Sequence, residues 1–418
     1  MAVFERLVAA ISSLDSEALA VVPERCVQVR HKGAKCLRCA EVCAAGAIAY
    51  DGEDVTIDGD LCIGCGSCAT ACPTCALEAI HPADTELSTA LAERVGAGDE
   101  IVIACARALS RARRRAEEAA EAASGLLRRV PVDFDASRIL QVVCLGRVDE
   151  SFYAECAARG VGAVTLASDG CEACKYRRGG RLARASAASA AALLDAHGYA
   201  LAVDFTEPLA PEACAARGVS GVMDFDPAKR ATIATLREMT ARAAQEAAAD
   251  AVALGAEDPH ATEEVPVRFA KVSADGTLPQ FLPVRRNRVV NSLQRLGAPV
   301  ADEVTCRLWG QVSIDREQCS SCRMCATFCP TGAIARFEEE DGTIGIDHRA
   351  YRCVQCRLCE NICPTGALSV SDTVSLGDFE RGRTQRIPMN PPAWTPNKPD
   401  SIFQKMNQVI GGEHNSYF

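Results

Sequence analysis

The sequence predicts two compact α+β modules rich in cysteine, one near each end, with an α/β domain built on a parallel sheet between them. Two observations carry this prediction. Of the 24 cysteines in the 418 residues, nine lie between Cys26 and Cys75 and eight between Cys319 and Cys363. Between these groups, short apolar runs alternate with helical stretches, which is typical of a parallel sheet covered by helices.

We expect five segments along the chain. These are an N-terminal module over 1–97, an α/β domain with a trailing helix over 98–254, a connector over 255–305, a C-terminal module over 306–371 and an extended arm over 372–418. The connector is assigned from its mixed glycine, proline and charged residues, and the arm from its polar, proline-rich composition. Such an arm is typical of disorder or of a segment that wraps a partner subunit.

Four apolar runs in the middle domain are expected to form buried parallel strands: 101–104, 139–143, 163–167 and 201–203. Helices are expected between them, at 107–124, 150–159 and 181–197. A longer helix is expected from Pro227 to about Leu254, because proline is favourable at a first helical position.

Charge and composition narrow the class of protein. The formal net charge of −10 and the sequence pI of 5.3 argue against a nucleic-acid-binding protein, which usually presents a concentrated basic surface. Residues 1–20 lack the pattern of a secretory signal, and no apolar run is long enough to cross a bilayer. We therefore expect a cytoplasmic protein whose cysteines are reduced and bound to metal.

One pattern occurs four times in the chain. In each copy a cysteine follows two others, four and seven residues behind it, and a short turn comes next. The last cysteines of the copies are Cys43, Cys72, Cys329 and Cys363, and the turns read AAGAI, PTCAL, PTGAI and PTGAL. Because the copies come in pairs, each pair predicts one module with pseudo-twofold symmetry.

Three copies contain the complete run C-x2-C-x2-C-x3-C followed by proline: Cys62, Cys65, Cys68 and Cys72; Cys319, Cys322, Cys325 and Cys329; Cys353, Cys356, Cys359 and Cys363. Three thiolates at this spacing can each bind a different iron of one cubane, while the fourth points away. In these features the end modules resemble bacterial two-cluster ferredoxins. The predicted fold class is therefore two α+β ferredoxin-like dicluster modules flanking an α/β parallel-sheet domain.

The resemblance implies four [4Fe–4S] clusters, two in each module, with the last cysteine of each run binding the other cluster of its pair. For the C-terminal module it implies one cluster on Cys319, Cys322, Cys325 and Cys363, and one on Cys353, Cys356, Cys359 and Cys329. For the N-terminal module it implies one cluster on Cys62, Cys65, Cys68 and Cys43.

The first copy departs from the pattern, because Gly33 stands where its first cysteine is expected. We expect Cys26 to complete a fourth site with Cys36, Cys39 and Cys72, and residues 27–35 to loop out. Cys75 occupies the glycine position of its own copy and is expected to be a small buried residue, although it could replace Cys26 or Cys72. Structural zinc is the alternative for all these cysteines, but zinc knuckles use pairs of cysteines rather than runs of four.

In the middle domain four cysteines lie just after predicted strands, where ligands gather in open α/β sheets: Cys105, Cys144, Cys171 and Cys174. The segments Cys144–Asp149 and Gly170–Tyr176 resemble the small iron–sulfur subunit of methyl-viologen-reducing hydrogenase, whose relatives occur in heterodisulfide reductase systems. The resemblance spans about residues 101–201 and implies a [2Fe–2S] cluster on these four cysteines. The alternative is a scaffold domain without a cluster. Cys156, Cys214 and Cys306 have no partner at ligand spacing and are expected in the core.

The sequence favours an electron-relay subunit over a catalytic one. No paired histidines, G-x-G-x-x-G or phosphate loop is visible, so no catalytic residue is assigned and flavin or nicotinamide binding is not supported. A relay without a substrate site implies a catalytic oxidoreductase subunit and a redox donor or acceptor protein as partners. The family resemblance implies that the catalytic subunit is of hydrogenase, heterodisulfide-reductase-like or molybdopterin (formate dehydrogenase) type. The alternative is a catalytic reductase in which a cluster short of one ligand binds substrate, and the irregular Cys26 site is the place to look for it.

Overall fold

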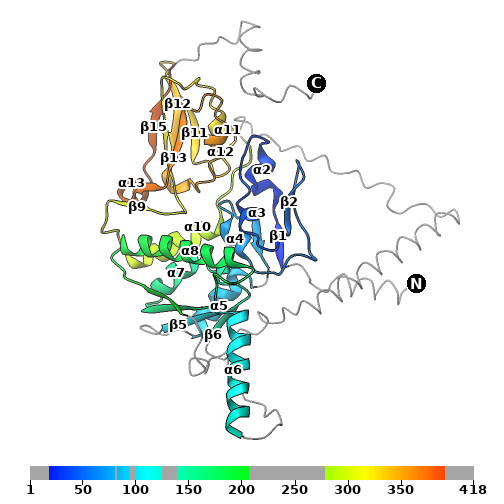
Figure 1. Cartoon of the computed structure of the whole chain (residues 1–418). Coiled ribbons are helices and arrows are strands. Elements are labelled where there is room, and N and C mark those ends of the chain that lie inside the picture. The colour runs from blue at the N-terminus through cyan, green and yellow to red at the C-terminus, as the bar shows by residue number, and fades with distance from the viewer. Residues whose placement is uncertain (1–17, 81, 95–99, 125–138, 207–277, 391–418) are drawn as a thin grey trace, which may run out of the picture.

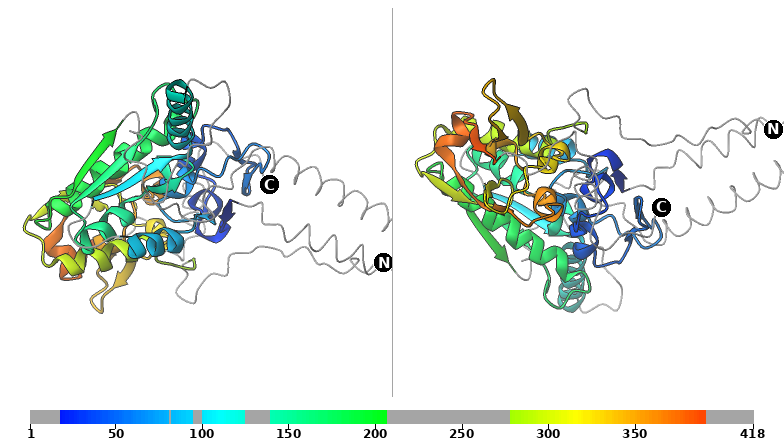
Figure 2. Two further views of the ribbon diagram at one scale, coloured as in Figure 1. Left: turned by 90° about the horizontal axis from the view of Figure 1, so that it is seen from below. Right: turned by 90° about the horizontal axis from the view of Figure 1, so that it is seen from above.

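The computed structural model describes residues 18–80, 82–94, 100–124, 139–206 and 278–390 (Figure 1). The expected helix at 227–254, Cys214, residues 255–277 of the expected connector and residues 391–418 of the expected arm lie outside these ranges. The described residues form an N-terminal module, a sheet domain and a C-terminal module. The views from above and below show the N-terminal module beside the other two parts (Figure 2).

The N-terminal module closes by pairing its first strand with its last. Strand β1 (Leu19–Val21) runs antiparallel to β4 (Leu77–Ala79), and β2 (Ile48–Tyr50) forms a hairpin with β3 (Val55–Ile57). Four short helices connect them: η1 (Pro23–Arg25), α2 (Val27–Arg30), α3 (Arg38–Val42) and α4 (Ser67–Ala71).

The C-terminal module repeats this arrangement. Strand β10 (Gln311–Ile314) pairs with β13 (Leu368–Ser371), and β11 (Ile334–Glu338) forms a hairpin with β12 (Ile344–His348). The connecting helices are α11 (Met324–Thr327), η4 (Ala350–Arg352) and α12 (Leu358–Asn361). In both modules, therefore, the first strand pairs with the last, and a hairpin lies between them in the sequence.

Part of the segment expected as an extended arm is folded instead. Strand β14 (Thr373–Ser375) pairs with β9 (Glu303–Thr305), helix α13 (Leu376–Glu380) follows, and β15 (Gln385–Pro388) pairs with β12. Val374 and Leu376 are buried, and the core they enter also contains Trp309. The prediction of an arm is therefore wrong for residues 373–388, because burial of these apolar side chains favours a folded segment.

Part of the expected connector is also a structural element. Residues Val284–Leu296 form helix α10, which packs on α7 and buries Val289 and Leu293. The segment expected as a connector up to residue 305 therefore contains α10, which belongs to the core of the middle domain.

The middle domain contains a four-stranded parallel sheet in the order β6-β5-β7-β8. Its strands are β5 (Glu100–Cys105), β6 (Ile139–Val142), β7 (Ala163–Ala167) and β8 (Ala202–Thr206). The helices around it are α5 (Asp84–Arg94), α6 (Ala106–Ser124), η2 (Leu145–Arg147), α7 (Glu150–Ala158) and α8 (Arg177–Asp195). All four strands expected from the sequence are present, and they are parallel.

The two faces of the sheet alternate along β5, as the period of a strand requires. Ile101 and Ile103 pack in the core cluster that includes α7, α8 and α10, whereas Ala104 packs with Leu109 and Ala112 of α6. Helix α6 projects away from the rest of the molecule (Figure 1). Among the helices of the described ranges, none combines the length and the apolar character needed to cross a membrane.

Candidate iron–sulfur sites

Two small cavities in the C-terminal module are each lined by four of the expected ligands. One contains Cys319, Cys322, Cys325 and Cys363, and is named here the Cys319 site. The other contains Cys353, Cys356, Cys359 and Cys329, and is named the Cys353 site. Each set joins three cysteines of one run with the last cysteine of the other, so the fold brings together the crossed sets that the sequence predicts.

The backbone explains how one run directs three thiols into one cavity. The residues on either side of the second cysteine have left-handed φ angles: Gln355 (50°) and Arg357 (58°) in one run, and Ser321 (55°) and Arg323 (56°) in the other. In the N-terminal run, the glycines Gly64 and Gly66 have φ angles of 66° and 69° at the same places. These two turns wrap the chain around the cavity, and glycine adopts them without strain.

The φ angle beside the second cysteine also distinguishes the first copy of the pattern from the other three. Its second cysteine is Cys36, and the following residue Leu37 has a φ of −124°, so the left-handed turn is missing. Helix α2 occupies the segment between Cys26 and the remaining cysteines. The irregular spacing in the sequence therefore corresponds to a different local path of the chain.

The N-terminal module nevertheless gathers two sets of thiols. Burial raises the pKa of the Cys68 thiol, and Cys65, Cys62, Cys39 and Cys43 raise it further. Burial likewise raises the pKa of Cys39 to about 12, with added effects of Cys72, Cys26 and Cys36. We name the two sets the Cys62 site (Cys62, Cys65, Cys68 and Cys43) and the Cys26 site (Cys26, Cys36, Cys39 and Cys72). They adjoin each other in one core cluster.

Buried thiols of this kind fit a metal cluster. Burial raises the pKa of Cys353 to about 12, so a thiolate there requires a cation to stabilise it. Four sulfur donors and no nitrogen or oxygen donor form a ligand set suited to iron–sulfur clusters. Among the described residues, no three or more His, Cys, Asp or Glu side chains lie close enough together to hold one single metal ion. An iron–sulfur cluster does not require such a group, because each thiolate binds a different iron.

Cys75 lies near Cys72 but its thiol contacts an arginine. Its Sγ accepts a hydrogen bond from Nη2 of Arg285 at 3.4 Å. Its φ is 48°, whereas the corresponding turn residues Gly46, Gly332 and Gly366 have φ angles of 69°, 63° and 67°. Cys75 therefore adopts a glycine conformation, at a cost of about 1–2 kcal/mol for a residue with a Cβ.

Cys75→Gly should consequently leave the iron content per chain unchanged. Cys26→Ala should lower the iron content, because Cys26 lies with Cys36 and Cys72. Iron and acid-labile sulfide analysis of the two variants, purified anaerobically side by side, checks this. Loss of iron from the Cys75 variant with retention in the Cys26 variant would exchange their roles.

The cysteines of the middle domain also come together. Cys105 ends β5, Cys144 follows β6, and Cys171 and Cys174 lie in the loop between β7 and α8. Burial raises the pKa of Cys105, and the neighbouring Cys171 and Cys174 have smaller effects in the same direction. Burial, with smaller effects of Cys65, Cys105 and Cys171, raises the pKa of Cys144 to about 12. We name this set the Cys105 site. Cys156 and Cys306 are buried in the core, as expected.

A contact that the sequence analysis missed joins the Cys105 site to the Cys62 site. Ser67 is 1% exposed, and its Oγ lies 3.6 Å from Sγ of Cys65. A side chain at Gly179 would clash with both Ser67 Oγ and Cys144 Sγ. Glycine at this position thus permits the close approach of the N-terminal module to α8.

A second contact joins the Cys26 site to the Cys353 site. Cys36 and Cys356 pack in one apolar cluster with Val27, Ala34 and Leu358. Beside it, Nη2 of Arg38 donates to the carbonyl oxygen of Gln355 at 3.0 Å, across a separation of 317 residues. Neither contact has a signal in the local sequence, because the paired residues are far apart in the chain.

Comparison with known proteins identifies the three parts separately. Residues 318–367 match the 4Fe-4S dicluster domain family, and residues 55–78 match the 4Fe-4S binding domain family. A ferredoxin 7Fe from Hydrogenibacillus schlegelii is 41% identical over 58 residues, which are 14% of this chain and 67% of that protein. The chain belongs to the ferredoxin family of 4Fe-4S proteins.

Between the ferredoxin-type modules, residues 113–214 match the family of the methyl-viologen-reducing hydrogenase delta subunit. This match contains Cys144, Cys171 and Cys174 and begins after Cys105. The indolepyruvate oxidoreductase subunit IorA of Archaeoglobus fulgidus is 46% identical over 48 residues, which are 12% of this chain and 7% of that protein. No solved structure matches the chain.

Proposed function

We propose that this protein is the iron–sulfur relay subunit of a cytoplasmic oxidoreductase complex, with four [4Fe–4S] clusters and one [2Fe–2S] cluster. When bound, such clusters supply one-electron transfer. The observation that carries the proposal is the close approach of expected ligand residues of neighbouring parts. Cys36 and Cys356 pack against one apolar cluster and act on each other electrostatically, and Cys65 acts on Cys144 in the same way. These contacts allow one continuous route through all three parts of the chain.

The contacts support a specific order of the five sites. The Cys105 site adjoins the Cys62 site, which adjoins the Cys26 site through Cys68 and Cys39. The Cys26 site adjoins the Cys353 site, and this adjoins the Cys319 site through Cys359 and Cys325. The Cys105 and Cys319 sites are thereby the two ends of the route, where partner proteins would exchange electrons.

The partners we propose are a catalytic oxidoreductase subunit at one end and a redox donor or acceptor protein at the other. The likeness of residues 113–214 to a hydrogenase subunit favours a hydrogenase or heterodisulfide-reductase-like complex, with a molybdopterin enzyme as a further candidate. A catalytic role for this chain would need a site short of a ligand. Four cysteines gather at the Cys26 site, which favours the relay.

Each chain should contain about 18 iron atoms and about 18 acid-labile sulfides, about 16 of each in the cubanes and two of each in the [2Fe–2S] cluster. Cys144→Ala should remove the two-iron electron paramagnetic resonance (EPR) signal and leave the cubane signals intact. Analysis of both proteins after strictly anaerobic purification measures this. An unchanged spectrum in the variant would disprove the fifth cluster, and zinc in place of iron would disprove the relay.

A further inference from the structure

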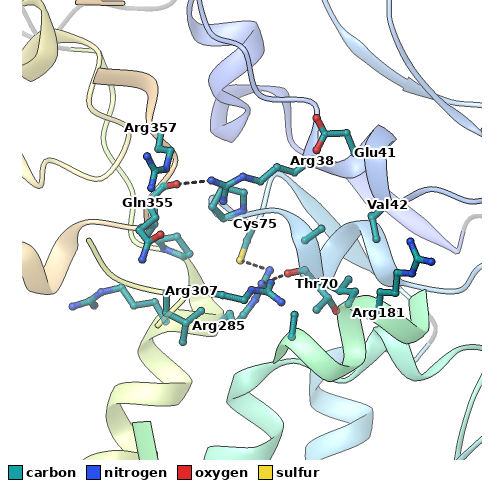
Figure 3. A pocket seen from close by; sticks show the side chains of 18 of the residues that line it. Arg38, Glu41, Val42, Thr70, Cys75, Arg181, Arg285, Arg307, Gln355 and Arg357 are labelled. Atoms are coloured by element: carbon teal, nitrogen blue, oxygen red, sulfur yellow. Dashed lines mark hydrogen bonds between the residues drawn. The ribbon is translucent and has the colours of Figure 1, made fainter. Parts of the chain in front are cut away.

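A cavity of about 620 Å³ lies where the three parts of the molecule meet (Figure 3). Its walls come from α3 and the end of α4 in the N-terminal module, from α8 and α10 in the middle domain, and from the loop around Gln355 in the C-terminal module. A cavity of this volume is in the range of small-molecule binding sites.

The lining is strongly basic. One acidic residue, Glu41, faces seven arginines: Arg38, Arg178, Arg181, Arg285, Arg286, Arg307 and Arg357. Four of the seven have a carboxylate partner: Arg181 with Glu172, Arg285 with Asp149, Arg307 with Glu150 and Arg357 with Glu360. Among the described residues, Arg38, Arg178 and Arg286 have no carboxylate within ion-pair distance, so the cavity carries uncompensated positive charge.

Arg286 is the most informative of these three. It is 9% exposed, its Nη1 donates to Asn287 Oδ1 at 3.2 Å, and its buried Nε has no partner among the described residues. Burial, with a smaller effect of the nearby Arg352, lowers the pKa of Arg286 to about 10. A buried guanidinium without a counter-charge is costly, and an anion would supply both the charge and the missing acceptor.

The backbone adds to the attraction for an anion. Arg285 and Arg286 stand in the first turn of α10, which has no acidic residue, and Pro283 at its start provides no side-chain cap. Pro283 lines the cavity. The unpaired amide groups at a helix N-terminus favour negative charge, so this end of α10 and the arginines act in the same direction.

We propose that this cavity binds an organic oxyanion, a small molecule that carries phosphate or carboxylate groups. Arginine recognises both groups through paired N–H donors. The apolar side chains of Val42, Leu182, Leu308 and Val354 also line the cavity and would contact the organic part. The inference goes beyond the relay function and does not depend on it.

Two residues that line the cavity stand next to cysteines of the candidate sites in the sequence. Gln355 lies between Cys353 and Cys356, and Arg38 precedes Cys39. A bound anion would therefore contact cluster-binding loops of both ferredoxin-type modules and stabilise their contact across Arg38 and Gln355.

Isothermal titration calorimetry of the anaerobic full-length protein tests the proposal, with ADP, inorganic pyrophosphate and citrate as probes. We expect at least one to bind, and Arg286→Gln to weaken that binding by about 10- to 100-fold, the loss of one charge-assisted hydrogen bond. ADP and pyrophosphate would identify a phosphate ligand, and citrate a carboxylate ligand.

The matched control is Arg295→Gln, which removes the same charge from an exposed position on the same helix. It should leave binding unchanged, and an unaltered cluster spectrum verifies that both variants are folded. The proposal is overturned if none of the probes binds, or if both variants weaken binding equally. It is also overturned if heat is released only with a polyglutamate peptide, which would indicate an acidic segment of a partner protein.

Discussion

Replacing Arg285 with methionine should lower the free energy of unfolding by about 3–5 kcal/mol, the cost of breaking a buried ion pair. Arg285 is 6% exposed and Asp149 is 4% exposed, and Nε of Arg285 lies 3.2 Å from Oδ2 of Asp149. The other guanidinium nitrogens donate to the carbonyl oxygens of Ala69, Thr70 and Cys72 at 2.5, 2.6 and 2.9 Å. Methionine fills the space but leaves the carboxylate and three acceptors without this donor.

Urea denaturation of the anaerobic protein, followed by circular dichroism, measures this loss. Arg295→Met on the same helix is the control, and as an exposed substitution it should change stability by less than about 0.5 kcal/mol. Asp149→Asn should resemble Arg285→Met, since it removes the charge paired with Arg285, whereas an asparagine oxygen can still cap α7 by accepting from the amides of Ser151 and Phe152. Equal effects of the two arginine variants would show that the buried pair contributes nothing.

Replacing Cys356 with alanine should divide the proposed relay into two parts that exchange electrons more slowly by orders of magnitude. Cys356 belongs to the Cys353 site and packs in one cluster with Cys36. Electron tunnelling decays exponentially with distance, so removal of a site from the middle of the proposed order leaves a gap too long for rapid transfer. The Cys319 site would remain, separated from the rest.

Flash photoreduction with less than one electron per chain, followed by freeze-quenched EPR, measures how the electron redistributes among the sites. Cys322→Ala is the matched control, because it removes the terminal site and leaves the other four in contact. Redistribution as fast in the Cys356 variant as in the unmodified protein would mean that electrons cross by another route.

The cysteine runs and the parallel strands could be predicted from the sequence because their signals are local. The run from Cys353 to Cys363 is recognised from its own spacing, without reference to any distant residue. Strands β5, β6 and β7 are short, mostly apolar runs with buried side chains, whereas β8 at the edge of the sheet contains Asp204 and none of its residues is fully buried. Both kinds of pattern fit within about ten residues.

The contacts that join the sites could not be predicted in this way. Arg38 meets Gln355 across 317 residues, and Arg285 meets Ala69 across 216. Helix α10 was missed because its arginines obscure the apolar period of Val289, Leu293 and Leu296. Strands β14 and β15 contain three and four residues, too few for a period of two to be distinguished from a polar tail.

The contacts of Arg285 also constrain how the protein is made. The carbonyl groups at the end of α4 are synthesised early, but their donor lies 213 residues beyond Cys72. At about 5–20 residues per second, a ribosome needs roughly 10–40 s to cover that interval. During that time the nascent N-terminal module has its cysteines but not the side chain that secures the loop carrying Cys72. The loop that carries Cys72 thus reaches its final geometry only after the first turn of α10 has emerged.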